Sequence, residues 1–256
     1  MPPLLTIVTI TRNDEDGLKA TLASASGLHA RLDVEHIVVE GNDGGMRPVE
    51  PPTGVNVVSR EPRGISDAFN TGITAARGEW IWFLNGGDTV HPEADIEFVV
   101  RALALTHADA VIFDVEREDG KNYRPTLPEI WPPIINWIPH PATFVRTELV
   151  RSAGGFSTEF RIAADMDLWY RIFSRGSKVD LINHRVAWFA SGGLSSTQHG
   201  IVCQENLRIL WVHRSRIAHH IIRLNLLVPY GILIASITAL LGKPPRWLTL
   251  VSRRNR

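Results

Sequence analysis

The feature that most constrains the fold is the alternation of short apolar runs with helix-like segments over the first 90 residues. Strands buried on both faces of a sheet have the composition found at residues 4–10, 34–40, 55–59 and 80–85. Residues 14–27 and 65–76 carry apolar side chains at helical spacing. This alternation predicts an α/β fold with a doubly wound sheet.

The pattern loosens beyond residue 90. Residues 92–107 and a segment starting near Asp165 have helical periodicity, and residues 110–124 indicate two strands around Asp119-Gly120, which is a hairpin signal. Residues 125–141 are rich in Pro and Trp and predict an irregular surface loop. Two short strands separated by Asn183-His184 are expected after the second helix.

The charges are balanced overall but unevenly placed. The 27 basic and 27 acidic side chains give a net charge of zero, which argues against a nucleic-acid-binding protein. Residues 201–256 hold nine basic side chains and one acid, Glu205, a net charge of +8; residues 1–200 hold 18 and 26, a net charge of −8. This split suggests a surface partner for the basic tail.

The most apolar window, residues 224–241, lies within that tail. It is 18 residues long, includes Asn225 and Pro229, and has basic residues on both sides. This pattern predicts a segment lying in an anionic membrane face, and a buried C-terminal helix pair is the alternative. With one cysteine, Cys203, and no signal-peptide pattern, we expect a cytoplasmic protein, peripheral or monotopic at the inner membrane.

Polar residues follow the predicted strands where an open α/β sheet binds ligands. The first strand ends in Thr9 to Asn13, the second in Glu40 to Asp43 and the fourth in Asn85-Gly86-Gly87-Asp88. No strand is followed by GxGxxG, and the chain has no P-loop, so these two nucleotide-binding motifs are excluded. A rim of carboxylates suits nucleotide phosphates only if Mg²⁺ or Mn²⁺ lies between them.

A series of motifs resembles the family 2 glycosyltransferases of GT-A fold over about residues 4–200. They are Arg63-Gly-Ile-Ser-Asp-Ala-Phe-Asn-Thr-Gly72, Gly78-Glu-Trp-Ile-Trp-Phe-Leu-Asn-Gly-Gly-Asp88, His140-Pro-Ala-Thr-Phe-Val-Arg146, Gly154-Gly-Phe156, Ala164-Asp-Met-Asp-Leu-Trp-Tyr-Arg171 and Gly192-Gly-Leu-Ser-Ser196. Their order and spacing make the combined signal specific. The resemblance is greatest to the subgroup that builds bacterial surface polysaccharides and glycolipids.

The resemblance implies a Rossmann-like, nucleotide-binding mixed sheet flanked by helices. Residues 1–90 would form the nucleotide-binding half, residues 91–200 the acceptor-binding half and residues 201–256 a helical membrane-associating extension. The implied enzyme is a metal-dependent inverting glycosyltransferase that uses Mn²⁺ or Mg²⁺. It would move a sugar from a nucleotide-diphosphate donor to a lipid-linked or saccharide acceptor at the cytoplasmic membrane face, without a nucleic-acid partner.

The resemblance also assigns roles at the donor end of the site. Asp88 is similar to the last carboxylate of the DxD-type motif and would hold the metal, although Gly86 and Gly87 leave it without its usual acidic neighbour; a turn Asp is the alternative. Glu40 stands where relatives carry an Asp that contacts the base. Further nucleoside or diphosphate contacts are expected from Thr9, Arg12, Asp67 and Asn70; Asp67 could instead cap its helix.

At the acceptor end, Asp165 is the candidate general base, because inversion requires a carboxylate to accept the acceptor's hydroxyl proton. Asp167 is the less favoured base, and either acid could instead serve the helix N-terminus. His140 would line the acceptor or diphosphate side or lie in a turn. Arg171 would neutralise the leaving phosphate or pair with an acid on its own helix. The Gly192-Gly193 stretch would close over the donor.

Two other functions remain compatible with the residues. A nucleotidyltransferase also needs Mg²⁺ and carboxylates, but it would normally carry a glycine-rich basic loop after the first strand. A catalytically inactive relative serving as a membrane-bound assembly subunit is consistent with the thinned Gly86-Gly87-Asp88 motif. Retention of Asp67 and Asp165 argues against inactivity.

Overall fold

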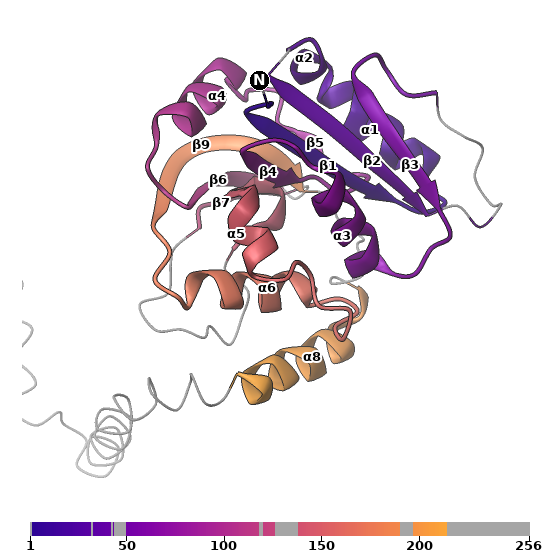
Figure 1. Cartoon of the computed structure of the whole chain (residues 1–256), viewed down its shortest axis with the longest axis vertical. Helices are drawn as coiled ribbons and strands as arrows, with labels where there is room; N and C mark the ends of the chain where they lie inside the picture. Colours follow the sequence, from indigo (N-terminus) through magenta and orange to yellow (C-terminus); the bar gives the residue numbers. More distant parts are fainter. Residues whose placement is uncertain are drawn as a thin grey trace, which may run out of the picture. The chain divides into compact units, whose positions relative to one another are not determined.

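A computed structural model describes residues 2–31, 33–41, 43, 50–117, 120–125, 138–189 and 197–213 (Figure 1). Within these residues the centre is a nine-stranded mixed sheet in the order β3-β2-β1-β4-β8-β6-β9-β5, with β7 paired to β6. The strands are β1 (Leu5–Thr11), β2 (Val34–Gly41), β3 (Val55–Arg60), β4 (Trp80–Phe83), β5 (Thr89–Val90), β6 (Ala110–Arg117), β7 (Asn122–Tyr123), β8 (Thr143–Arg146) and β9 (Val179–Phe189).

Helices cover both faces of this sheet. They are α1 (Glu15–Ser24), α2 (Ser26–His29), α3 (Ile65–Ala75), α4 (Ile96–Leu105), the 3₁₀ turn η1 (His140–Ala142), α5 (Thr147–Ser152), α6 (Ala164–Phe173) and α8 (His199–Val212). α3, α5 and α6 pack on one face, where Phe69, Val150 and Trp169 meet Val8 and Phe83. On the opposite face, α2 and α4 pack against β1 and β4, and α1 packs against β2.

The four parallel strands of the N-terminal half confirm the predicted α/β alternation. β1 pairs in parallel with β2 and with β4, and β2 pairs in parallel with β3. β1 and β4 are almost wholly buried, which explains their continuous apolar sequences. Two aspartates begin the helices: Asp14 accepts from the amide of Gly17 at the start of α1, and Asp95 accepts from that of Phe98 at the start of α4.

The C-terminal half of the sheet makes it mixed. The predicted hairpin is present, since β6 pairs antiparallel with β7. Our prediction of two strands around Asn183-His184 is wrong: β9 is one strand of 11 residues. Its register with β6 jumps from Ile182 opposite Phe113 to Arg185 opposite Asp114, so the two polar residues form an irregularity within a continuous strand.

The chain divides into two compact units, Met1–Ile209 and Leu210–Arg256. Only residues 210–213 of the second unit are described, so the predicted membrane-associating window at 224–241 lies outside the described residues, as does most of the predicted loop at 125–141. Across the part of the chain that the structure covers, every helix is too short or too polar to cross a membrane.

Candidate active site

A pocket of about 600 Å³ opens at the carboxyl edge of β1 and β4. Its lining comes from five segments: the end of β1, the end of β2 at Val39 and Gly41, Asn85 and Gly86 after β4, the β3–α3 connection with the first turn of α3, and the stretch before α6 that carries Thr158, Phe160 and Arg161. The parallel pairing of β1 with β4 brings the first and third of these segments to one edge. This is the position at which the sequence predicts ligand binding.

Arginines give the pocket its electrostatic character. Arg12 pairs with Asp43 at 3.0 Å, as Arg60 does with Asp67 at 3.1 Å, so both sequence-predicted residues, Arg12 and Asp67, lie in the lining with their charges balanced. Two further lining residues, Arg63 and Arg161, make no ion pair with any described residue. The lining also contains the acids Asp14, which caps α1, and Glu61, so among the described residues two arginines without an ion pair face one carboxylate without a partner, Glu61. The remaining positive charge suits an anionic ligand.

The turn that carries Asp88 is fastened to α1 by Thr21. The hydroxyl of Thr21 accepts from the amide of Gly87 at 3.0 Å and donates to the carbonyl of Asp88 at 2.7 Å. Gly87 has φ of 98°, a conformation that side chains strongly disfavour, so the second glycine of the motif is required by the turn. The side chain of Asp88 is 4% exposed. Sequence reasoning missed Thr21, because its partners lie 66 and 67 residues away.

The donor set around this turn fits a cation that arrives with a phosphate ligand. Among the described residues, no three His, Cys, Asp or Glu side chains lie together as a complete metal site. Asp88 supplies one carboxylate, and Mg²⁺ commonly binds one or two protein carboxylates while substrate phosphates and water complete its shell. The described residues thus suit a shared cation better than one bound by protein alone.

Glu40 and Thr9 lie on the face of the sheet that α1 and α2 cover. Glu40 is 4% exposed, and its Oε1 atom is buried with no hydrogen-bond partner among the residues that the structure describes, which leaves an acceptor for a ligand at the end of β2. Thr9 is wholly buried, and its hydroxyl lies 2.9 Å from Nε2 of His36. Thr9 is absent from the pocket lining, whereas Thr11 is part of it.

Asn70 is occupied by the main chain. Its side-chain amide donates to the carbonyl of Phe156 and accepts from the amide of the same residue, both at 2.8 Å. A Cβ at Gly155 would lie 2.4 Å from Oδ1 of Asn70, so the glycine permits this close approach. Our assignment of Asn70 to the nucleotide is not supported by its placement, because both amide atoms already tie α3 to the Gly154-Gly155-Phe156 turn.

Burial separates the two acids of α6. Asp167 is 3% exposed and pairs with Arg171 at 2.7 Å, whereas Asp165 in the same first turn is only partly buried. Arg171 also donates to the carbonyls of Ala153 and Gly155. We predicted that Arg171 would either neutralise the leaving phosphate or pair with an acid on its own helix, and the structure shows the pair with Asp167. Asp167 is therefore engaged, and Asp165 remains the better-placed acid for a ligand.

His140 lies in an aromatic cage. The rings of Phe69, Phe83, Phe156 and Trp169 surround it, with centroids 5.2 to 6.0 Å away. Burial lowers the pKa of His140 to about 4, so the imidazole is neutral near pH 7. Both ring nitrogens are buried without a hydrogen-bond partner among the described residues. Gly192 and Gly193, the predicted closing loop, lie outside the described residues.

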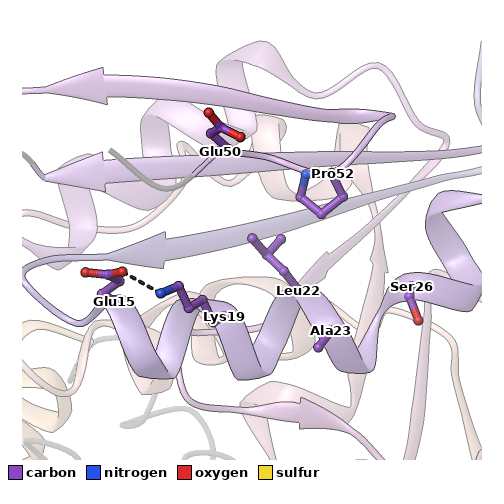
Figure 2. Close-up of a pocket in the computed structure, with 7 residues that line it drawn as sticks. All are labelled: Glu15, Lys19, Leu22, Ala23, Ser26, Glu50 and Pro52. Atoms are coloured by element: carbon purple, nitrogen blue, oxygen red, sulfur yellow. Dashed lines mark hydrogen bonds and ion pairs between the residues drawn. The ribbon is translucent and has the colours of Figure 1, made fainter. Parts of the chain in front are cut away.

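A second pocket, of about 470 Å³, lies beside α1. Figure 2 shows that its lining combines one side of α1 with Glu50 and Pro52 ahead of β3, and that Lys19 reaches Glu15 along the helix. None of its lining residues follows the carboxyl end of a strand. We therefore place the active site at the first pocket.

The arrangement of sheet, pocket and acids agrees with the comparison to known families. Residues 6–166, more than half of the chain, match the family model described as glycosyl transferase family 2. The chain belongs to this family. Membership confirms the sequence-based recognition and makes the chain a transferase enzyme.

Two curated relatives and one solved structure extend the comparison. An uncharacterized glycosyltransferase of Mycobacterium tuberculosis is 31% identical over 66% of this chain and 68% of its own length. A PGL/p-HBAD biosynthesis glycosyltransferase of Mycobacterium bovis is 32% identical over 58% of each chain. A mannosyltransferase from Pyrobaculum calidifontis, solved with GDP-Man and Mn²⁺, covers 99% of this chain and 80% of its own at 19% identity and a TM-score of 0.62. This structural likeness confirms the mixed α/β sheet flanked by helices.

Replacing Arg171 with Met should destabilise this glycosyltransferase by about 3–5 kcal/mol, because Asp167 would stay buried without its partner. Urea unfolding measures the change. Lys19→Met is the matched control, since it breaks another i,i+4 pair whose side chains are 57% and 40% exposed and should leave stability close to that of the wild type. Equal losses in the two variants would contradict this account of α6.

Stability should fall as the pH drops from about 6.5 towards 4, in part because of His140. The unfolded chain takes up a proton on this imidazole near pH 6.5, whereas the folded chain does so only near the lowered pKa of about 4. The difference corresponds to about 3 kcal/mol. In His140→Phe, unfolding free energies measured across this range should decline less steeply. If the unfolding free energies of wild type and His140→Phe decline equally with falling pH, His140 is not a source of the pH dependence.

Proposed function

We propose that the chain is a metal-dependent inverting glycosyltransferase that moves a sugar from a nucleotide-diphosphate donor to a hydroxyl of a lipid-linked or polysaccharide acceptor. The observation that carries the proposal is the pocket at the carboxyl edge of β1 and β4, which is lined by Arg63 and Arg161, without an ion pair among the described residues, and by Asn85 and Gly86 of the turn that leads to Asp88. Family membership favours glycosyl transfer over the nucleotidyl transfer that the sequence left open.

The donor's nucleoside and diphosphate are proposed to lie along this edge. Glu40 offers its unpartnered Oε1 to an N–H of the base, and Arg12 and Asp67 lie within the pocket lining. Arg63 and Arg161 supply positive charge to the phosphates, because neither has an acidic partner among the described residues. The mannosyltransferase solved with GDP-Man supports a nucleotide-sugar donor, and the identity of the base and sugar is left to experiment.

Asp88 would hold a divalent cation together with the diphosphate. Such a cation neutralises the charge that develops on the departing nucleotide diphosphate. The mannosyltransferase solved with Mn²⁺ supports divalent-metal use in this fold. The residues of this chain leave the choice between Mn²⁺ and Mg²⁺ open, since a carboxylate and phosphate oxygens suit both ions.

Asp165 is proposed to take the proton of the acceptor hydroxyl as that oxygen attacks the anomeric carbon. Its partial exposure supports this role, whereas the neighbouring Asp167 is committed to Arg171. Attack from the side opposite the departing diphosphate inverts the configuration of the sugar. The neutral, buried His140 cannot carry positive charge near pH 7, so electrostatic stabilisation of the leaving group falls to the arginines and the cation.

We propose a lipid-linked or polysaccharide acceptor and a site of action at the cytoplasmic face of the membrane. The net charge of +8 in residues 201–256 supports attraction to anionic lipids. The relative named for PGL/p-HBAD biosynthesis supports an acceptor of this class. Transfer assays with lipid-linked and soluble saccharide acceptors in parallel would decide between the two.

Asp88→Ala should remove the effect of Mn²⁺ on donor binding. Calorimetric titration of UDP and GDP with and without Mn²⁺ measures this, and we expect metal-assisted affinity to fall by at least about tenfold while metal-free affinity is retained. Asp95→Asn is the control, because Asp95 caps α4 and is exposed. If Mn²⁺ assists binding equally in the wild type and Asp88→Ala, the metal assignment is wrong.

Asp165→Asn should lower sugar transfer by about 10²- to 10⁴-fold, since the amide cannot accept the acceptor's proton. Donor affinity and the melting temperature should stay near wild type, because the substitution keeps the size of a partly exposed side chain. Initial rates with a radiolabelled donor provide the measurement. Transfer at the wild-type rate would remove Asp165 from the mechanism.

A further inference from the structure

Glu205 of α8 binds three consecutive backbone amides just before α6. Its Oε1 accepts from Arg161 at 2.7 Å, and its Oε2 accepts from Ile162 at 2.9 Å and from Ala163 at 2.8 Å. The residues lie more than 40 positions apart in the sequence. Glu205 is also the one acid among residues 201–256, so its carboxylate is an exception in an otherwise basic stretch.

These bonds lie at the N-terminus of α6. Ala163, which precedes the first helical residue, has no side chain able to cap the helix. The first amides of a helix lack intrahelical partners, and a carboxylate there also interacts favourably with the helix dipole. Glu205 therefore binds the amide of the N-cap residue Ala163 and those of the two residues before it. Within the first turn, the amide of Met166 donates to Oδ1 of Asp165 at 2.7 Å.

The segment that Glu205 binds, residues 161–163, lies between pocket-lining residues and the candidate base. Thr158, Phe160 and Arg161 line the pocket, and Asp165 lies in the first turn of α6. α8 is fixed beside this segment by Ile209, which is wholly buried in the core. A shift of residues 161–163 would thus move both a pocket arginine and the candidate base.

We infer that Glu205 is a positioning residue for sugar transfer: by binding the amides of residues 161–163, it sets the position of Asp165. The inference rests on the proposed role of Asp165. Glutamine at this position would keep only one acceptor oxygen. Its NH₂ group would face a backbone N–H, with which it cannot form a hydrogen bond. Aspartate would keep both acceptor oxygens on a shorter side chain.

The first arm of the test measures hydrogen exchange of the peptide that contains residues 158–166 in the full-length chain. Glu205→Gln should speed exchange of the amides of 161–163 by about tenfold or more, because they lose charge-assisted hydrogen bonds. Arg208→Gln is the matched control; it breaks the neighbouring pair with Glu159, whose side chains are 54% and 62% exposed, and should leave this exchange unchanged. Unchanged exchange in Glu205→Gln would overturn the inference.

The second arm measures transfer. Glu205→Gln should lower kcat by about 10- to 100-fold, as expected for a small displacement of a catalytic group, whereas Arg208→Gln should not. Glu205→Asp should recover part of the loss. In an Asp165→Asn background, Glu205→Gln should reduce the residual rate by less than about twofold, because its effect passes through the absent carboxylate.

Two results of the second arm would overturn the inference. One is a wild-type kcat in Glu205→Gln despite faster exchange. The other is an equal fold-loss in the Asp165→Asn background, which would place the effect of Glu205 elsewhere. A wild-type chain that transfers no sugar from any donor would instead overturn the proposed function. The exchange arm would still decide whether Glu205 orders the segment before α6.

Discussion

The pairing of β1 with β4 at the centre of the sheet is the interaction on which the rest of the site depends. Leu5 to Val8 lie opposite Trp80 to Phe83 in parallel register, and these side chains are at most 2% exposed. Close packing of large side chains on both faces fixes the register, as does the buried Thr6 hydroxyl, which accepts from the amide of Gly78 just before β4 at 2.8 Å. The parallel direction then delivers Arg12 and the Asp88 turn to one edge, where α3 and the segment before α6 enclose the pocket.

The polar side chains around this edge fall into two groups: those that are hydrogen-bonded to the main chain, and those with an atom or charge that no described residue pairs. Thr21, Asn70 and Arg171 are occupied by main-chain groups, and they hold the turns that shape the site. Glu40 has a buried oxygen, and the exposed Arg63 and Arg161 have charges, that the described residues do not pair. Buried polar groups normally find partners, so the Glu40 oxygen is the strongest structural sign of a ligand contact at this edge. Side chains that are hydrogen-bonded to the main chain thus shape the site, and a smaller number of unpaired side chains is left for a ligand.

Periodicity predicted the first half of the fold well, because its strands and helices are complete local units. It failed where the partner of a residue is remote. Asn70 was assigned to the nucleotide from its motif, yet its partner Phe156 lies 86 residues away and is known only from the tertiary fold. For Arg171, the pair with Asp167 on its own helix was one of the two alternatives, whereas its bonds to the Gly154-Gly155 turn needed the structure. Asn183-His184 resembled a break between strands, whereas pairing with β6 carries β9 through it. Glu205 gave no local signal beyond its lone negative charge.

The contact of α8 with the segment before α6 has a consequence for how the chain can be divided. The family motifs end near residue 200, and a fragment cut there would retain the pocket lining, Asp88 and Asp165. It would lose Glu205 and the buried Ile209, and with them the docked surface of α8. The smallest self-sufficient fragment therefore extends to at least Ile209, the end of the first compact unit. Homology boundaries drawn from motifs alone would therefore produce a protein in which the segment before α6 lacks its contacts with α8.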